Sequence, residues 1–362
     1  MSAVDHRRRL HRIPELDNQL PETIQYVRSV LEPLGCKVFS PVTGSVCAWF
    51  DAGRGDTVAF RADMDALPVP EETGLPYASE HPGCMHACGH DGHMAMMLSL
   101  AEWTAEHVKE LPHNVLFLFQ PAEETTGGAR KLCESGVLER YRVRRIFGVH
   151  LWPGLPAGTV WSRPGPLMAR SNEVTVTVEG LSVHLSRAAE GRDALTAGIS
   201  YLERAYDMMD ALPSDQPRIL RFGKMVSGTV RNAVSGQTVL EGSLRKDIFR
   251  FCRQQLRDIG KAVAEETGCT VDVHLSEGYP AVWNHEELYQ KVCRQLGDSA
   301  PALLDHPALA AEDFSFYQQY VPGVFFFLGV GDTAELHAPT FSFDDEAILP
   351  AGVEFLQKLL LL

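Results

Sequence analysis

The chain has 362 residues, more than one domain usually contains, and its 47 acidic and 33 basic residues give a formal net charge of −14. This acidity argues against nucleic-acid binding, which relies on clustered basic residues. No apolar run approaches the roughly 20 residues of a membrane span, the first residues lack the apolar core of a signal peptide, and eight irregularly spaced cysteines suit reduced thiols. We therefore expect a cytoplasmic protein of two domains that has neither nucleic acid nor a membrane as partner.

Several apolar, strand-like runs end in polar residues. Runs that are apolar throughout are typical of strands buried on both faces of a parallel sheet, and open sheets of this type bind ligands beyond the carboxyl ends of their strands. The polar segments are therefore expected to meet at one rim of a sheet. The runs, each with the polar segment after it, are 57–60 with 61–65, 115–119 with 120–124, 145–149 with His150, and 323–328 with 337–339.

The nine residues from Met85 to His93, Met-His-Ala-Cys-Gly-His-Asp-Gly-His, contain one thiol and three imidazoles. Cys88 and His90 are two positions apart, so they can converge on one cation from the loop before an apolar helix that starts near Asp91. The segment Gln-Pro-Ala-Glu-Glu at 120–124 adds carboxylates. A thiolate, an imidazole and a carboxylate form a mixed ligand set suited to zinc, manganese or cobalt. Together these motifs predict a metal site with its own general base.

The organisation of the chain changes near residue 170, where a strictly alternating strand pattern begins. The elements that follow are expected in the order strand, helix, strand, strand, helix, strand, which is the ferredoxin-like pattern. They are predicted at 173–178, 193–211, Arg218 to Arg231, 237–245, Ile248 to Thr267, and 270–276. We therefore expect an inserted α+β domain at 171–280, between two parts of a first domain at 1–170 and 281–362.

These motifs resemble the metal-dependent amidohydrolase branch of the aminoacylase and carboxypeptidase metallohydrolases, which includes hippurate hydrolases, N-acyl-amino-acid amidohydrolases and auxin-conjugate hydrolases. The opening His11-Arg-Ile-Pro-Glu-Leu16 also fits, so the resemblance covers nearly the whole chain. It implies an α/β catalytic domain with a mixed, mainly parallel sheet flanked by helices, and an inserted ferredoxin-like lid and dimerisation domain. The matching segments are 61–67, 85–93, 120–124, 148–150 and 336–337.

The resemblance implies two divalent ions per chain, of manganese, zinc or cobalt, and assigns Glu123 as the general base. Glu123 would take a proton from a metal-activated water and pass it to the leaving amine. The segment Glu312-Asp313 fits either a role in the site or a helix cap. The implied metal ligands are Cys88, His90, Glu124, His150 and His337. The residues expected as neighbours of the site are Asp63, Asp65, Asp91 and His93. The three aspartates among them could hold the second ring nitrogen of a ligating histidine.

In the inserted domain the resemblance implies that His184 reaches across a dimer and steadies the oxyanion in the partner's site. Asn232 would lie beside it, and Arg245 would pair with a substrate carboxylate in two-pronged geometry. The glycine pair and the proline that the family has around this histidine are missing from the loop at 180–191, and the proline after Asn232 is also absent.

The sequence thus predicts a cytoplasmic two-metal hydrolase that cleaves the amide bond of a small N-acyl amino acid or amino-acid conjugate, as a homodimer or dimer-based oligomer. One alternative is a dipeptidase or a deacetylase of an N-acetyl diamino acid. Another is a catalytically silent homologue that binds a metal or a ligand. The intact Glu123 argues against silence, because a protein without catalysis needs no base.

Overall fold

The computed structural model describes residues 1–213, 219–245 and 249–362 and divides into two compact units. Unit 1 comprises Met1–Leu167, Val282–Asp305 and Glu312–Leu362, and unit 2 comprises Met168–Ala281 and His306–Ala311. The chain therefore leaves unit 1, builds unit 2, and returns twice. Among the described residues, no helix combines the length and the apolar character that a membrane crossing requires.

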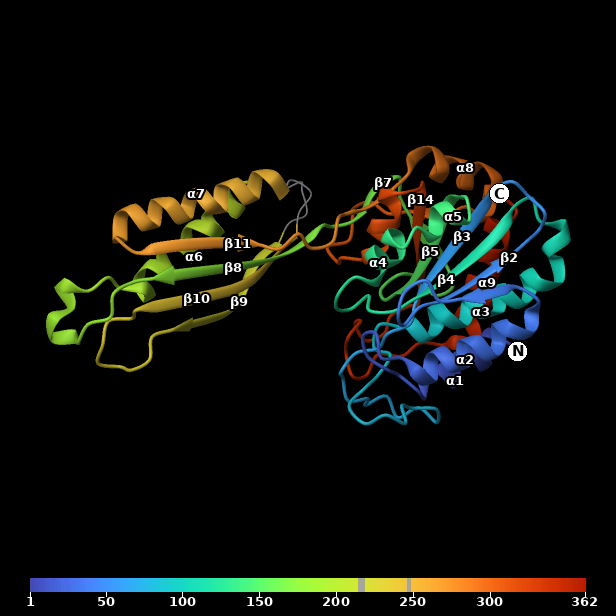
Figure 1. Cartoon of the computed structure of the whole chain (residues 1–362), viewed down its shortest axis with the longest axis horizontal. Coiled ribbons are helices and arrows are strands. Elements are labelled where there is room, and N and C mark those ends of the chain that lie inside the picture. Colours follow the sequence, from blue (N-terminus) through green and yellow to red (C-terminus); the bar gives the residue numbers. More distant parts are fainter. Residues whose placement is uncertain (214–218, 246–248) are drawn as a thin grey trace. The chain divides into compact units, whose positions relative to one another are not determined.

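An eight-stranded mixed sheet forms the centre of unit 1 (Figure 1). Its four middle strands run parallel, whereas β1, β2 and β6 join antiparallel to their inner neighbours and β13 pairs parallel with β6. Every residue of β3, β4 and β14 is buried, as expected for strands covered on both faces. In sheet order the strands are β1 Lys37–Phe39, β2 Val46–Phe50, β4 Asn114–Gln120, β3 Thr57–Asp63, β5 Val143–Trp152, β14 Gly323–Gly329, β6 Val160–Ser162 and β13 Ala302–Leu303.

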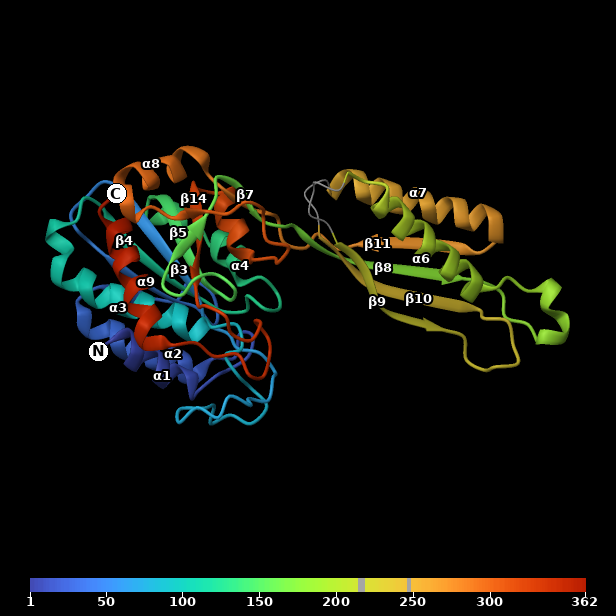
Figure 2. The same cartoon turned by 180° about the vertical axis from the view of Figure 1, so that it is seen from behind.

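Helices cover both faces of this sheet (Figures 1 and 2). On one face, α3 contacts the sheet and packs with α1, α2 and α9, and α4, α5 and α8 lie on the other. The first group is α1 Ala3–His11, α2 Pro21–Leu31, α3 His90–His107 and α9 Asp345–Leu360, and the second is α4 Gly128–Glu134, α5 Val137–Arg140 and α8 Glu286–Leu296. The 3-10 helices of this unit are η1 Glu32–Leu34, η2 Val108–Glu110, η4 Gly297–Ser299 and η5 Asp313–Gln319, and β7 Gly165–Met168 pairs with β12 Val282–Asn284.

The position of α3 against the sheet depends on two glycines. Gly89 precedes the helix with φ +80°, in the left-handed region that favours glycine. A Cβ on Gly92 would lie 2.6 Å from Cδ1 of Leu151, so the first turn of α3 packs directly on β5. This close approach sets the first residue of α3, His90, beside the carboxyl end of β5.

Unit 2 is a four-stranded antiparallel sheet with two helices on one face (Figures 1 and 2). Alternate residues of β8 are buried beneath these helices, in the pattern of a strand with one covered face. The element order and the strand order β11-β8-β10-β9 form the ferredoxin-like arrangement that the sequence predicts. The elements are β8 Ser171–Glu179, η3 Leu185–Glu190, α6 Ala194–Asp210, β9 Ile219–Ser227, β10 Gln237–Arg245, α7 Phe249–Thr267 and β11 Thr270–Leu275.

Element boundaries differ from the sequence-based expectations at several points. The strand expected to continue to Arg231 ends at Ser227, because Gly228 has φ +67° and turns the chain. The expected starts at Arg218 and Ile248 lie outside the described residues. His150 was expected after a strand, but β5 runs on to Trp152 and His150 lies within its carboxyl end.

Candidate metal centre

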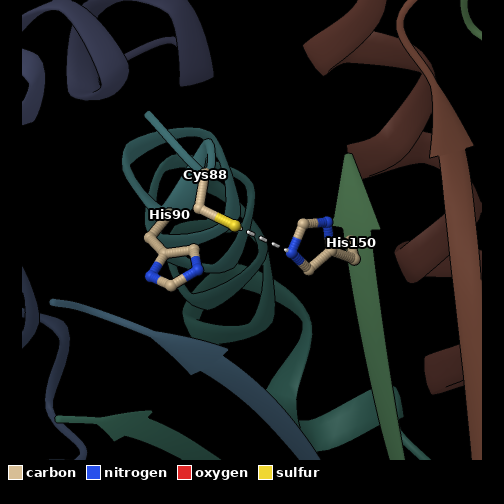
Figure 3. A group of neighbouring side chains, drawn as sticks. All are labelled: Cys88, His90 and His150. Carbon is tan, nitrogen blue, oxygen red and sulfur yellow. Dashed lines mark hydrogen bonds between the residues drawn. The ribbon is translucent and has the colours of Figure 1, made fainter. Parts of the chain in front are cut away.

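The implied ligands of unit 1 gather around the first turn of α3. Figure 3 shows three of them, Cys88, His90 and His150. The ligand atoms of Cys88, His90 and His150 all lie within 4.8 Å of one another, and so do those of Cys88, Glu124 and His337. Sγ of Cys88 is 3.5 Å from Nε2 of His150. The two groups share Cys88, so all five side chains surround one small region.

Two atoms of this cluster show that the region suits a cation. Nε2 of His90 and Oε1 of Glu124 are both buried; the first has no hydrogen-bond partner among the described residues, and the second lies 3.3 Å from Nε2 of His337. They lie 3.8 Å apart, too far for a hydrogen bond between them. A buried polar atom without a partner costs free energy, and a divalent ion bound by Nε2 of His90 would remove that cost. The combination of sulfur, nitrogen and oxygen donors fits zinc, manganese or cobalt.

Each histidine of the cluster is oriented through its second ring nitrogen. His90 donates Nδ1–H to the backbone oxygen of Asp65 at 2.7 Å, which leaves Nε2 facing the cluster. His150 donates Nδ1–H to the backbone oxygen of Leu151 at 2.7 Å, which leaves Nε2 facing Cys88. Such contacts fix the tautomer and ring orientation of metal-binding histidines. Backbone oxygens make both contacts, and the one that holds His90 belongs to Asp65, one of the aspartates that the sequence offers for this role.

The aspartates and His93 support the site in other ways. The carboxylate of Asp65 accepts the backbone N–H groups of Glu123 and Glu124 at 2.9 and 3.0 Å. Asp63 binds Nδ1 of His93 at 2.6 Å, and Nε2 of His93 accepts the N–H of Leu151 at 2.9 Å. Asp65 therefore fixes the loop that carries both glutamates, whereas His93 connects α3 to the strand that carries His150.

The two adjacent glutamates differ in environment. Burial, together with the charges of Glu312 and Glu124, raises the pKa of Glu123 well above its usual range. Burial acts in the same direction on Glu124, but the hydrogen bond to His337 and the charge of His90 outweigh it and lower the pKa of Glu124. A pair of carboxyl groups whose pKa values are pushed apart suits one proton carrier and one permanent anion.

His337 has a strained backbone conformation, and the surroundings of Cys88 favour the protonated thiol. His337 has φ +69°, in the left-handed region that costs a non-glycine residue roughly 1–3 kcal/mol, and its N–H donates to the oxygen of Ala87 at 2.9 Å. Its Nε2 is 3.3 Å from Oε1 of Glu124. Burial, with the charges of Glu124 and Glu123, raises the pKa of the Cys88 thiol well above its usual range. A metal that binds this sulfur would therefore displace a proton.

A buried charge cluster beside Glu123 centres on Arg61, to which the sequence analysis gave no role. Its guanidinium donates to Asp63 at 2.8 Å and to Asp313 at 2.6 Å, and pairs with Glu312 at 2.9 Å. Carboxylate oxygens of Glu312 and Asp313 lie within 4.8 Å of Glu123. Glu312 also accepts the N–H of Phe314 as the N-cap of η5, so it both caps a helix and lies at the site. In the sequence, the charged residue at position 61 inside an apolar strand was the signal that could have identified this cluster.

The candidate residues of unit 2 lie at opposite ends of its sheet, with His184 and Asn232 at one end and Arg245 at the other. His184 is exposed beyond the Glu179 end of the sheet, where it forms a bridge with Ala233 beside Asn232. Arg245 lies at the opposite end of β10, paired with Ser171, and donates to the oxygen of Leu309 at 2.8 Å. Eight register steps separate the two ends of β10, which corresponds to about 26 Å. One copy of unit 2 therefore cannot place both groups on one small substrate.

A surface cavity of about 750 Å³ lies at the His184 end of unit 2. Apolar side chains line much of it, among them Leu185, Leu195 and Val230. The polar residues of the lining include Asp193 and Arg231.

Comparison with known proteins places this geometry in context. A profile of peptidase family M20/M25/M40 matches residues 59–362. An N-acetyldiaminopimelate deacetylase of Lacticaseibacillus paracasei is 35% identical over 98% of this chain and 97% of that protein, and one of Streptococcus uberis is 35% identical over 99% of both. A putative aminohydrolase structure from methicillin-resistant Staphylococcus aureus has 28% identity and a TM-score of 0.92, covering 99% of this chain and 95% of that one. A Bacillus subtilis structure described as a dinuclear metal binding peptidase from the M20 family has 30% identity and a TM-score of 0.85, with 99% and 96% covered.

Proposed function

Because the chain belongs to peptidase family M20/M25/M40, we propose that it is a metal-dependent hydrolase that cleaves the amide bond of N-acyl amino acids or small amino-acid conjugates. The observation that carries the proposal is the buried Nε2 of His90, which has no hydrogen-bond partner among the described residues and lies 3.8 Å from the buried Oε1 of Glu124, among further donors and beside Glu123. The matching relatives support the same reaction class, because deacetylases and peptidases both hydrolyse amide bonds.

We assign two divalent ions to the donor groups that share Cys88, in agreement with the description of the Bacillus subtilis relative as a dinuclear metal binding peptidase. When bound, such ions lower the pKa of water and polarise the amide carbonyl. The chain's own part is to hold the donors. Asp65 and Leu151 orient the imidazoles of His90 and His150, and His337 is held through its N–H.

Glu123 acts as the general base in this proposal. Its raised pKa, caused by burial and by the neighbouring Glu312 and Glu124, suits a carboxyl group that accepts and later delivers a proton. Glu123 would accept a proton from the attacking water and later deliver it to the departing amine nitrogen. Glu124, whose pKa is lowered, stays ionised as a ligand.

We further propose that unit 2 acts as a lid and dimerisation domain. His184, with Asn232 beside it, would donate to the oxyanion in the site of a second copy, and Arg245 would bind the substrate carboxylate. The length of β10 supports this arrangement. Because His184 and Arg245 lie at opposite ends of this strand, a small substrate that contacts both must contact two copies of the chain. Apolar side chains exposed along α6 and the edge strand β9 support pairing with a second copy, and they are Leu195, Ile199, Met225 and Val226.

A second candidate substrate class is an N-acetyl diamino acid. Several relatives that match nearly the whole chain, at 32–35% identity, are N-acetyldiaminopimelate deacetylases. Such a substrate is itself an N-acyl amino acid, so the same machinery would serve. A silent homologue is disfavoured, because the chain keeps Glu123 as well as the complete donor set. No disulfide joins any of the eight cysteines, all of which lie among the described residues, and this supports the proposed cytoplasmic location, where thiols remain reduced.

The test is activity against N-acetyl and N-benzoyl amino acids, dipeptides and N-acetyldiaminopimelate, with manganese, zinc or cobalt added to metal-free protein. We expect up to two ions per chain by metal analysis, and loss of turnover on chelation. Full activity of the metal-free protein would contradict the proposal. Preference for N-acetyldiaminopimelate over the other substrates would select the second candidate.

A further inference from the structure

Asp91 links the candidate metal centre to a helix that contributes no ligand. It is the second residue of α3, directly after His90, and its side chain is fully buried. Its Oδ2 accepts Nε–H of Arg7 at 3.1 Å and Nδ1–H of His11 at 2.7 Å. Both partners are on α1, one turn apart on its buried face.

The same two α1 residues extend the network away from the metal centre. Nε2 of His11 binds Glu71 at 3.2 Å, and the other carboxylate oxygen of Glu71 accepts the N–H of Ser79 at 2.7 Å. Nη1 of Arg7 donates to Asp345, the first residue of α9, at 3.1 Å. Four segments that are distant in sequence are thus joined through two buried side chains of one helix.

The charges of this network hold it together. Burial alone would lower the pKa of His11, but Asp91 and Glu71 outweigh it and raise that pKa to about 9, so the ring donates from both nitrogens. Arg7 is 1% exposed and its guanidinium lies 4.0 Å from the ring centroid of Phe343. A buried carboxylate such as that of Asp91 is tolerated only when it is paired in good geometry. Arg7 and His11 therefore determine where Asp91 can lie.

The position of Asp91 in turn determines the position of His90. The first turn of α3 packs on Leu151 without free space, as Gly92 shows, and Nδ1 of His90 is bound to Asp65. Nε2 of His90 can face Glu124 only while this turn stays seated. A movement of Asp91 would move the adjacent ligand directly.

We propose that Arg7 and His11 are positioning residues that hold Asp91, and through it the Cys88–His90 ligand turn, in the geometry required for metal binding. The inference rests on the proposed metal centre. Asp345 and Glu71 are outer members of the network, because each contacts Arg7 or His11 without contacting Asp91.

The first test compares Asp91→Asn with Asp345→Asn. Each change removes a charged partner of Arg7, but only Asp91 adjoins a ligand. We expect the affinity of the metal-free protein for Zn²⁺ or Mn²⁺, measured by calorimetry, to fall roughly 10- to 100-fold in Asp91→Asn, as is typical for residues that support ligands, and to change less than about twofold in Asp345→Asn. A purely structural network would lower the thermal midpoint of both metal-free variants and leave both affinities alike, which would overturn the inference.

The second test uses His11, because a conservative change there keeps one end of the network. The amide nitrogen of asparagine takes the place of Nδ1, so His11→Asn keeps a donor to Asp91 and loses Glu71. The amide nitrogen of glutamine takes the place of Nε2, so His11→Gln keeps Glu71 and loses Asp91. We expect near-native metal affinity in His11→Asn and a loss of roughly tenfold or more in His11→Gln. Equal affinities, or the reverse order, would count against the inference.

Calorimetry on the wild-type protein distinguishes a failure of the proposed function from a failure of the positioning role alone. If calorimetry finds no tight divalent-ion site in wild type, the proposed function fails and the inference fails with it. If wild type binds the ions and the paired variants do not differ, only the positioning role is wrong.

Discussion

The candidate metal centre, at the rim of the large sheet of unit 1, and the His184 end of unit 2, here called the tip, hold their candidate residues in opposite ways. At the rim, His90 and His150 are buried, and each has its second ring nitrogen bound to a backbone oxygen. At the tip, His184 is exposed, and among the described residues its side chain bonds only Ser186: Nδ1 lies 2.9 Å from Oγ and accepts the backbone N–H at 3.2 Å. Arg245, expected to serve the same substrate, is at the far end of the sheet. Under the proposed function, one chain would contain the whole metal chemistry, whereas substrate contacts from unit 2 would depend on assembly.

The largest effect should come from Glu123, and it tests whether the chemistry belongs to unit 1 alone. In Glu123→Gln, we expect turnover to fall roughly 100- to 10,000-fold, because the proton acceptor is lost, with metal content unchanged. The matched control is Glu124→Gln, which should lose metal instead. Steady-state kinetics and metal analysis on both proteins provide the measurement. A near-native rate in Glu123→Gln would place proton transfer elsewhere.

The second prediction tests the dependence of unit 2 on assembly. His184→Ala should lose roughly 100- to 1,000-fold in turnover, the usual cost of a missing oxyanion donor. Mixing it with Glu123→Gln after dissociation should restore activity to roughly a quarter of wild type, since half of the dimers are mixed and each mixed dimer has one intact site. No recovery would mean that His184 acts within its own chain. A fully active monomer would exclude the shared site altogether.

The third prediction concerns the pH dependence of the stability that buried, charged His11 gives to unit 1. The folded-state pKa of His11, about 9, is above its ordinary value of 6.5. The stabilisation from His11 is therefore complete below about pH 6.5 and is lost as the pH rises through about 9. At about 1.4 kcal/mol per pKa unit, it amounts to roughly 3 kcal/mol.

The measurement is urea unfolding of metal-free wild type and His11→Asn at several pH values. The difference in unfolding free energy between them should be largest near pH 6 and should shrink through pH 9. A difference that does not change with pH would show that His11 is not held as a cation.

The smallest effect concerns Arg245 and the other end of unit 2. Arg245→Ala should raise KM roughly 10- to 100-fold with little change in kcat, the loss of one charge-assisted contact worth about 1.5–3 kcal/mol. Arg245→Lys should reverse only part of the rise in KM, since an ammonium cannot bind a carboxylate in two-pronged geometry. A substrate whose carboxylate is replaced by an amide should be insensitive to both changes. If Arg245 only holds Leu309, thermal stability will fall and KM will not change.

The strands that carry the rim were predictable because their burial on both faces leaves a simple trace. Residues 115–119 are apolar throughout and lie inside β4, and the alternation at 173–178 matches β8, which has one covered face. The short strands β6, β7, β12 and β13 have only two to four residues, too few to show a period. Long apolar or alternating runs could therefore be placed from sequence, and short edge strands could not.

The site was predictable where its residues are local. The nine-residue block at 85–93 and the pair Glu123-Glu124 brought the donors to attention, and the structure places them together. The Arg7, His11 and Asp91 network was missed because its contacts span 80 or more positions, although two polar residues one turn apart on a helix face were a usable signal. The separation of His184 from Arg245 follows from strand register, which no local pattern specifies.

The place of β14 in the large sheet has a consequence for synthesis of the chain. β14 lies between β5 and β6, yet its residues 323–329 follow the main segment of unit 2, which ends at Ala281. Domains tend to fold as units while the ribosome adds roughly 5–20 residues per second. The strands of unit 2 are therefore all available for roughly several seconds before β5 gains β14, its neighbour on the β6 side. During that interval the nascent chain exposes an unpaired apolar strand edge, and this is the stage at which aggregation competes most directly with folding.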